Sequence, residues 1–169
     1  SLITGVAQND VLLAKQLADQ LSASGARDRA YVQVISERAE TDPKEAARWL
    51  RNIDDEAMRG LATGQIAAQW TANDPVAAER WVSELPFGTP RDDAITFMSS
   101  QWRTPTPEQQ KLIESIENSE KRGQAKVRLV YNMMRSDPAK ARELLQDDDI
   151  SSAQRQQIEL MINKYGLRF

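Results

Sequence analysis

The chain has 169 residues, of which 40% are hydrophobic and 28% are charged, and its formal net charge is −3. This composition is typical of a folded, soluble protein, and so small a net charge favours neither nucleic acid nor a membrane surface as a general partner. Because the chain has no cysteine and no histidine, disulfides, Ser–His–Asp and Cys–His catalysis and the usual zinc sites are excluded.

A short motif that is typical of a helix start recurs along the chain at intervals of about 32 residues. It is found at Asp10, Asp42-Pro43, Asp74-Pro75, Thr106-Pro107 and Asp137-Pro138. An Asp or Thr side chain caps the first turn of a helix, and proline suits the first helical position because its missing N–H has no partner there. The spacing predicts five repeats, over residues 10–41, 42–73, 74–105, 106–136 and 137–169, with residues 1–9 as the tail of a preceding repeat.

We call this motif the start signal of a repeat. After each start signal, apolar residues follow with helical spacing and predict the first helix of the repeat. The seventh position after the Asp or Thr is always large and apolar: Leu17, Trp49, Trp81, Ile113 and Leu144. A second helix is predicted before the next start signal, and the position eight residues upstream of that signal is apolar throughout: Leu2, Val34, Ile66, Met98 and Leu129. Short breaks such as Ser24-Gly25 separate the two helices of a repeat.

The two ends of the chain do not coincide with the ends of whole repeats. The second helix of the fifth repeat is predicted from Ser152 to Tyr165, with Gly166 as its C-cap. Residues 2–8 match the end of a second helix whose first helix is absent. We therefore expect the chain to be the C-terminal piece of a longer solenoid.

The start signal with Ala and Trp four and seven residues later, as in Ala46 and Trp49 or Ala78 and Trp81, resembles the tetratricopeptide repeat. The resemblance spans nearly the whole chain, although the period is about 32 residues instead of 34. It implies an all-α, right-handed superhelix of about five antiparallel helix pairs plus a partial N-terminal helix. It also implies that the first helices line a concave groove that holds peptides or partner helices.

The resemblance places the fifth and ninth positions after each start signal on the concave side. The fifth-position row is Lys15, Ala47, Glu79, Lys111 and Arg142, and the ninth-position row is Asp19, Arg51, Ser83, Ser115 and Gln146. These rows are mostly polar and mixed in charge, which favours recognition of a charged or extended segment, with plain exposure to solvent as the alternative. The candidate partner-binding residues of the groove are therefore Lys15, Arg51, Glu79, Lys111 and Arg142.

The strongest local charge bias lies between residues 121 and 142, where seven basic residues are opposed by a single Asp. Lys121, Arg128 and Arg135 are seven residues apart, so we expect them on one helix face and count them as further candidate partner-binding residues. Three interpretations stay open for this face: ordinary solvation, an acidic protein partner, and nucleic acid, which would require more aromatic residues nearby.

Two other features are interpreted as structural. The tryptophans recur at equivalent repeat positions, which predicts core positions instead of ligand contacts; the pairs are Trp49 with Trp81 and Trp70 with Trp102. The run Asp147-Asp148-Asp149 lacks the alternate spacing and the glycine of a calcium loop. We expect it to be a solvated turn that caps a helix, with a hard cation as the alternative.

These features predict a non-catalytic scaffold or adaptor that binds a protein or peptide partner, an acidic one included, in its concave groove. We expect no cofactor, no metal, no nucleic acid and no membrane insertion, since no apolar run approaches the roughly 18 residues that a membrane span needs. One alternative is a helical accessory or regulatory domain of a larger enzyme whose catalytic part lies upstream of Ser1, and another is a structural spacer or a self-associating repeat. The oligomeric state and the compartment, cytoplasmic or periplasmic, stay open, with a lean towards a bacterial envelope.

Overall fold

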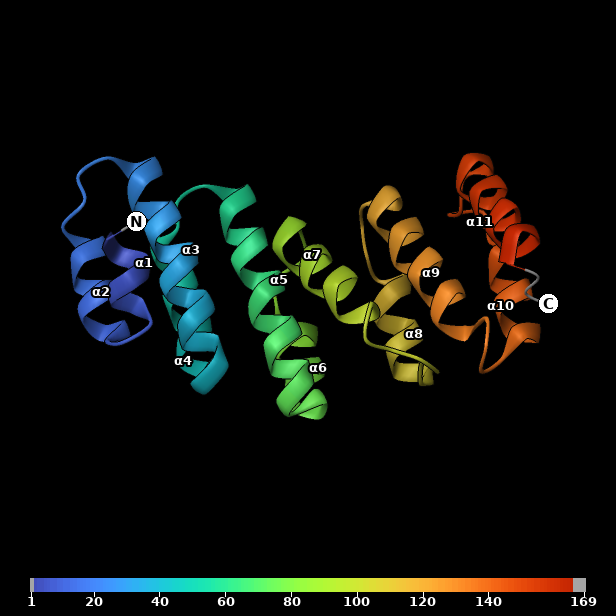
Figure 1. The fold of residues 1–169 in the computed structure, drawn as a ribbon, viewed down its shortest axis with the longest axis horizontal. Helices are drawn as coiled ribbons and strands as arrows, with labels where there is room; N and C mark the ends of the chain where they lie inside the picture. Colours follow the sequence, from blue (N-terminus) through green and yellow to red (C-terminus); the bar gives the residue numbers. More distant parts are fainter. Residues whose placement is uncertain (1, 166–169) are drawn as a thin grey trace. The chain divides into compact units, whose positions relative to one another are not determined.

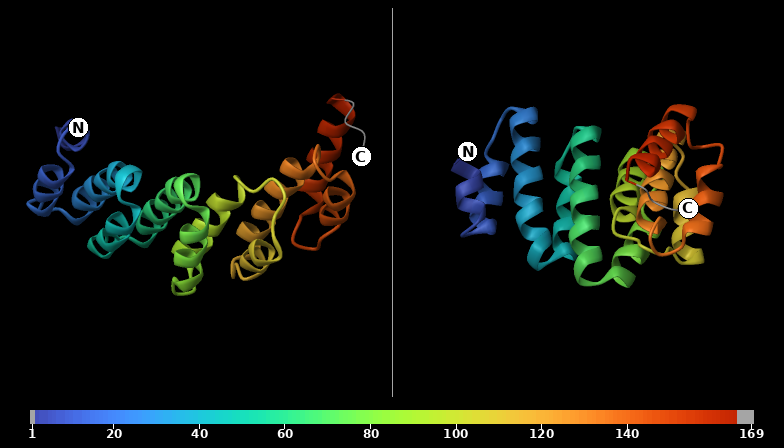
Figure 2. Two further views of the ribbon diagram at one scale, coloured as in Figure 1. Left: turned by 90° about the horizontal axis from the view of Figure 1, so that it is seen from below. Right: turned by 45° about the vertical axis from the view of Figure 1, so that its right-hand side comes forward.

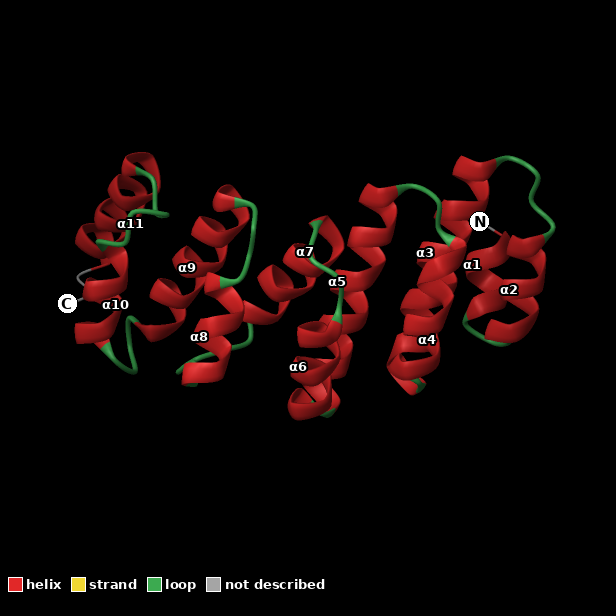
Figure 3. Cartoon of the chain, turned by 180° about the vertical axis from the view of Figure 1, so that it is seen from behind, coloured by secondary structure: helices red, strands yellow, loops and turns green. Residues whose placement is uncertain are grey.

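The computed structural model describes the backbone of residues 2–165, and the side chains of these residues apart from Leu2, Thr4, Lys164 and Tyr165. Over that range the regular secondary structure is all helical, with eleven α-helices, one 3₁₀ turn and no strand (Figures 1 and 3). The predicted all-α class is therefore confirmed. The chain divides into two compact units, unit 1 (Ser1–Ala94) and unit 2 (Ile95–Phe169), and the division falls within helix α7 (Thr89–Ser99).

Unit 1 is built from helices that pack on their neighbours along the chain. Its helices before α7 are α1 (Leu2–Ala7), α2 (Val11–Asp19), α3 (Ser24–Thr41), α4 (Pro43–Trp49), the 3₁₀ turn Leu50–Asn52, α5 (Glu56–Asn73) and α6 (Pro75–Glu84). The long helices α3 and α5 lie side by side, as Figure 1 and the right-hand view of Figure 2 both show, and the shorter α4 packs against both. α2 packs against α1 and α3, and α6 packs against α5. The main contacts thus join helices that are next, or next but one, in the chain.

Unit 2 continues from the end of α7. Its further helices are α8 (Pro107–Glu114), α9 (Ser119–Met133), α10 (Pro138–Leu145) and α11 (Ser152–Tyr165). α9 packs against both α8 and α10. Asn132 on α9 donates hydrogen bonds of 3.2 and 2.9 Å to the carbonyl oxygens of Ser100 and Trp102, which fixes the segment after α7. Arg155 on α11 donates a bond of 2.8 Å to the carbonyl oxygen of Leu145, which joins α11 to the end of α10.

Each predicted start signal caps a helix, and this part of the sequence prediction is confirmed. The four Asp side chains accept a hydrogen bond of 2.9–3.2 Å from the backbone N–H three residues later; they are Asp10, Asp42, Asp74 and Asp137. Thr106 and Gln109 form a reciprocal capping box, and Ser151 and Gln154 form another before α11. α11 has the predicted bounds, and the predicted C-cap Gly166 lies outside the described residues.

The apolar stripes contribute to the core, although the seventh position after the start signal is buried only at Trp49 and Ile113 and is half-buried at Leu17, Trp81 and Leu144. The position eight residues before each start signal is at most 2% exposed in the four repeats whose side chains are described: Val34, Ile66, Met98 and Leu129. Leu2, at the same position, lies outside the described side chains. The tryptophan prediction is confirmed for Trp49 and Trp102, which are buried, and holds only in part for Trp70 and Trp81, which are half-buried.

The second helix of the third repeat is shorter than the pattern predicts. α7 ends at Ser99, so Trp102 lies in the following loop, although the repeat spacing placed it on the helix. Pro105 stands just before the next start signal, where the other repeats have Thr41, Asn73 and Ser136. Because proline lacks an N–H and disfavours helical geometry in the residue before it, the helix cannot run on to that signal as it does in the first two repeats.

An arginine recurs near the start of the second helix in all five repeats, with the same period as the start signals: Arg27, Arg59, Arg91, Arg122 and Arg155. Arg59 and Arg122 each donate a hydrogen bond to a carbonyl oxygen six residues upstream, that of Ile53 at 3.0 Å and that of Ile116 at 2.7 Å. These carbonyls follow the end of the first helix, where the regular helical bonds have stopped. In these two repeats the arginine therefore fixes the loop between the helices.

Candidate binding groove in unit 2

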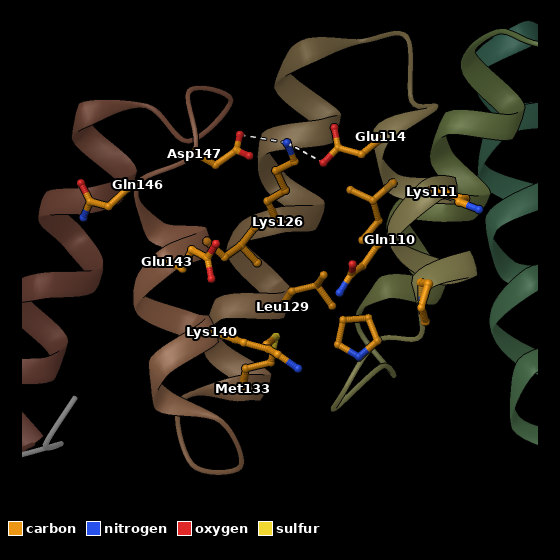
Figure 4. A pocket seen from close by; sticks show the side chains of 14 residues that line it. Gln110, Lys111, Glu114, Lys126, Leu129, Met133, Lys140, Glu143, Gln146 and Asp147 are labelled. Carbon is orange, nitrogen blue, oxygen red and sulfur yellow. Dashed lines mark hydrogen bonds and ion pairs between the residues drawn. The ribbon is translucent and has the colours of Figure 1, made fainter.

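A groove of about 700 Å³ opens between α8, α9 and α10 of unit 2 (Figure 4). α9 supplies the floor with Lys126, Leu129 and Met133, while α8 and α10 with their flanking loops supply the walls. The wall residues are Pro105, Pro107, Gln110, Lys111, Ile113 and Glu114 on the α8 side, and Lys140, Glu143, Leu144, Gln146 and Asp147 on the α10 side. The lining thus combines an apolar floor with polar side chains at the rim.

Smaller side chains at equivalent repeat positions help to explain why the groove is open in unit 2. In unit 1, Trp70 stands four residues before a start signal and Trp81 seven residues after it, and the two rings stack with centroids 5.4 Å apart. The equivalent residues in unit 2 are Met133 and Leu144, and both line the groove. Two aliphatic side chains fill less space than two indole rings, and the difference contributes to the groove.

Lys126 is buried beside the groove, with 3% of its side chain exposed, and is held by three carboxylates. Its ammonium nitrogen Nζ lies 2.7 Å from Asp149, 2.8 Å from Asp147 and 3.0 Å from Glu114. Arg122, one turn earlier on α9, donates two hydrogen bonds of 2.6 Å to Asp149. Because an unpaired charge in a protein interior is very costly, this cluster fixes α8 and the turn after α10 against α9.

The members of the cluster reinforce one another's charges. The hydrogen bonds that Arg122 donates hold the pKa of Asp149 well below its ordinary value, against the opposing effect of burial. Burial by itself would lower the pKa of Lys126, but the hydrogen bonds to Asp147, Asp149 and Glu114 outweigh it and raise that pKa above its usual range. Both groups therefore remain charged around neutral pH, and Lys126 is not a candidate general base.

This cluster should give unit 2 a stability plateau between about pH 5 and about pH 9. The folded pKa of Asp149 lies below the unfolded value of about 3.9, so its contribution is complete above that pH and is lost as the pH falls through it. The folded pKa of Lys126 lies above the unfolded value of about 10.4, so its contribution is complete below that pH and is lost as the pH rises. Urea unfolding of the wild type and of Asp149→Asn at several pH values would test this. The acid decline should be shallower in the variant, and an identical acid decline would contradict the assignment.

Three of the predicted partner-binding residues belong to unit 1 and do not line the groove. Lys15 on α2 pairs with Asp19 at 2.8 Å, and its ammonium lies 6.0 Å from the ring centroid of Trp49. Arg51 is exposed in the 3₁₀ turn, and Glu79 is half-buried on α6. A role in partner binding stays a prediction for each of them.

The five predicted residues of unit 2 are not brought together. The groove is lined by Lys111 but not by Lys121, Arg128, Arg135 or Arg142. α9 ends at Met133, so Arg135 lies beyond the helix, and the helix face predicted for the three basic residues is wrong in this respect. Arg128 donates a hydrogen bond of 3.2 Å to the carbonyl oxygen of Thr96, which gives it a structural role.

The acidic run after α10 differs from the solvated, helix-capping turn predicted for it. Asp147 and Asp149 face Lys126 and Arg122, and the cap of α11 is provided by the Ser151 side chain. The charge bias predicted for residues 121–142 did not include these carboxylates, because they lie just outside that range. Part of the basic charge of α9 is therefore balanced within unit 2.

The sequence pattern also missed Lys126, Glu114 and Asp147 as residues of the groove. A signal was available for Lys126, which stands eleven residues before a start signal. The residues at that position in the preceding repeats are all buried: Tyr31, Thr63 and Ile95. A lysine at a core position of a repeat predicts a buried ammonium, which must have carboxylate partners.

Among residues 2–165, no cluster of acidic residues is arranged so that it could hold a metal ion. No helix in the described part of the chain combines the length and the apolar character needed to cross a membrane. Comparisons with family models, with curated proteins and with solved structures give no match to the chain.

Proposed function

We propose that the protein is a non-catalytic helical-repeat module that binds an extended segment of another protein in the groove between α8, α9 and α10. The observation that carries this proposal is the groove itself, which joins an apolar floor at Leu129 and Met133 to a polar rim. Peptide-recognition grooves commonly combine pockets for side chains with polar groups that hold the main chain.

The rim suits a polypeptide that is close to neutral. The charged lining residues are three lysines and three carboxylates, so an approaching chain meets no excess of either sign: Lys111, Lys126, Lys140, Glu114, Glu143 and Asp147. Gln110 and Gln146 stand on opposite walls, and an amide side chain can both donate to and accept from a peptide main chain. These features favour a neutral segment over a strongly acidic one.

The repeat architecture expected from the sequence is part of the same proposal. Within unit 1 the main helix contacts join near neighbours in the chain, and within unit 2 α9 packs against the helix before it and the helix after it. Stability that arises from nearest-neighbour packing is typical of hairpin solenoids, whose elongated surfaces suit protein binding. The tetratricopeptide-like assignment rests on this packing together with the recurring caps.

Filling the groove should abolish binding and leave the fold intact. Leu144→Trp introduces the residue that unit 1 carries at the equivalent position, so the repeat frame can accommodate it, yet its ring should occupy the groove. Gln156→Trp is the matched control, because Gln156 is exposed on α11 and does not line the groove. We expect both variants to keep the circular dichroism spectrum of the wild type.

The readout is capture of proteins from a cell lysate by the three immobilised proteins. We expect one protein to be retained by the wild type and by Gln156→Trp, and to bind Leu144→Trp at least about tenfold more weakly, which is about 1.4 kcal/mol. Retention by all three proteins would show that binding lies outside the groove. Retention by none would count against a protein-binding function.

A further inference from the structure

The groove of unit 2 lies at a place in the repeat that tryptophan fills in unit 1. Trp70 on α5 and Trp81 on α6 stack at 5.4 Å, with an angle of 31° between the ring planes. Their equivalents on α9 and α10 are Met133 and Leu144. The same two repeat positions that hold an aromatic pair in unit 1 therefore border open space in unit 2.

We infer that the bound segment inserts one aromatic side chain into this space, against Met133 and Leu144. The inference rests on the proposed function, because it names the side chain that the groove recognises. An aromatic ring buries about 150–250 Å², more than most other side chains, and the sulfur of methionine makes favourable contacts with aromatic rings. The groove volume of about 700 Å³ leaves room for a ring together with flanking parts of the segment.

Lys111 stands at the rim of the groove, and its equivalent in unit 1, Lys15, lies near an aromatic ring. Lys15, five residues after one start signal, lies 6.0 Å from the ring centroid of Trp49, which is seven residues after the next signal. The equivalent pair in unit 2 is Lys111 and Leu144, and both line the groove. The ammonium of Lys111 is exposed and turned away from the groove centre in Figure 4, so a rotation of its flexible side chain would bring it over a ring seated beside Leu144.

The charges of the groove favour a neutral ring over an acidic anchor. Lys126, the cation of the floor, already pairs with three carboxylates, two of which, Glu114 and Asp147, line the groove. The ammonium of Lys140 lies 3.4 Å from a carboxylate oxygen of Asp137. A carboxylate entering the groove would compete with these existing pairs and would meet Glu143 on the wall, whereas an uncharged ring meets neither obstacle.

The test is a selection of displayed random peptides of about a dozen residues on immobilised wild-type protein, Leu144→Trp and Gln156→Trp. We expect sequences selected on the wild type and on Gln156→Trp to share one Trp, Phe or Tyr, and to be lost on Leu144→Trp. A synthetic peptide with the selected sequence should lose more than about tenfold in affinity when that aromatic residue is changed to leucine. Lys111→Gln should weaken binding of the aromatic peptide by about two- to fivefold and leave the leucine peptide unaffected.

The possible failures of this experiment are distinguishable. Selected peptides that bind the wild type but not Leu144→Trp, and that share no aromatic residue, would overturn the inference and leave the proposed function standing. Equal affinity of the aromatic and the leucine peptides would do the same. Peptides that bind Leu144→Trp as well as the wild type, or no enrichment on any of the three proteins, would overturn the proposed function and the inference together.

Discussion

Replacing Lys126 with methionine should destabilise unit 2 by about 3 kcal/mol. The wild-type ammonium is 3% exposed and compensates three carboxylates, and methionine keeps much of the side-chain volume while removing the charge. Asp147 and Asp149, which are 30% and 18% exposed, would then face each other with only Arg122 to balance them. Removing one partner of a buried ion pair typically costs about 3–5 kcal/mol, and the partial exposure of these carboxylates places the expected loss at the lower end.

Hydrogen exchange of the backbone amides of α9 and α10 is the appropriate measurement, because it reports on unit 2 separately from unit 1. The most protected amides should exchange about 100-fold faster in Lys126→Met, and the amides of unit 1 should be unaffected. Lys140→Met is the matched control: its side chain is 60% exposed and pairs with Asp137 at 3.4 Å, so the expected loss is below about 1 kcal/mol. Equal effects of the two substitutions would show that Lys126 is not held as described.

A second substitution tests the reason for the loss. If the cost of Lys126→Met comes from uncompensated negative charge, adding Asp147→Asn should restore part of the lost stability. The same Asp147→Asn change in the wild type should instead be destabilising, since it removes a partner of Lys126. Additive losses in the double variant would contradict the charge explanation.

The parts of the fold that follow from local chemistry were predictable from the sequence. A cap such as Asp42 needs only a backbone N–H three residues later, and the proline beside it fixes the first helical residue. The stripe that includes Ile66 is apolar because one face of each helix is buried, whichever neighbour covers it. Both signals depend on residues within one or two helical turns, so the helix starts and the buried position eight residues before the start signals were found correctly, whereas Trp70 and Trp81 are only half-buried.

The features that were missed depend on residues that are far apart in the sequence or on exceptions to the repeat. Lys126 reaches Asp147, 21 residues further along the chain, and no helical periodicity connects the two. α7 ends before the next start signal, and Pro105, which has no proline equivalent in the other repeats, prevents it from running on to that signal. Met133 and Leu144, which line the groove, stand where unit 1 has Trp70 and Trp81, and this difference becomes informative only once the groove is known.

The two units carry the same helix-start motif in their sequences but differ in the residues that follow it. In unit 1, large aromatic residues at the seventh position pack within the protein, as Trp49 does beneath Lys15. In unit 2, Leu144 at the same position lines a wall of the groove, and the ion cluster around the buried Lys126 joins the elements that form the walls. Buried apolar positions such as Ile66 and Leu129 form the core of both units, whereas Met133 and Leu144, which replace the tryptophans of unit 1, line the candidate groove.

Among the glycine-to-alanine substitutions considered, Gly123→Ala should cause the largest loss of stability. A Cβ atom there would lie 2.2 Å from the backbone oxygen of Asp149, which real Cβ contacts essentially never show. Because the obstacle is backbone, Gly123→Ala requires the turn after α10 to move away from α9, and this movement pulls Asp149 away from Arg122 and Lys126. We expect a loss of about 3 kcal/mol or more, from the combination of overpacking and a disrupted ion cluster.

Two other glycines provide graded controls for Gly123→Ala in urea unfolding experiments. At Gly25 on α3 the nearest atom to an added Cβ is 3.6 Å away, so Gly25→Ala should be stabilising by about 0.4–1 kcal/mol through the reduced entropy of the unfolded chain. At Gly60 the Cβ would lie 2.5 Å from a side-chain oxygen of Asp93, which can rotate, so the loss should fall between the other two. The order of stability should therefore be Gly25→Ala, then Gly60→Ala, then Gly123→Ala. A Gly123→Ala variant as stable as the wild type would mean that α9 and the turn after α10 are further apart than described, and the ion cluster would then lose its structural basis.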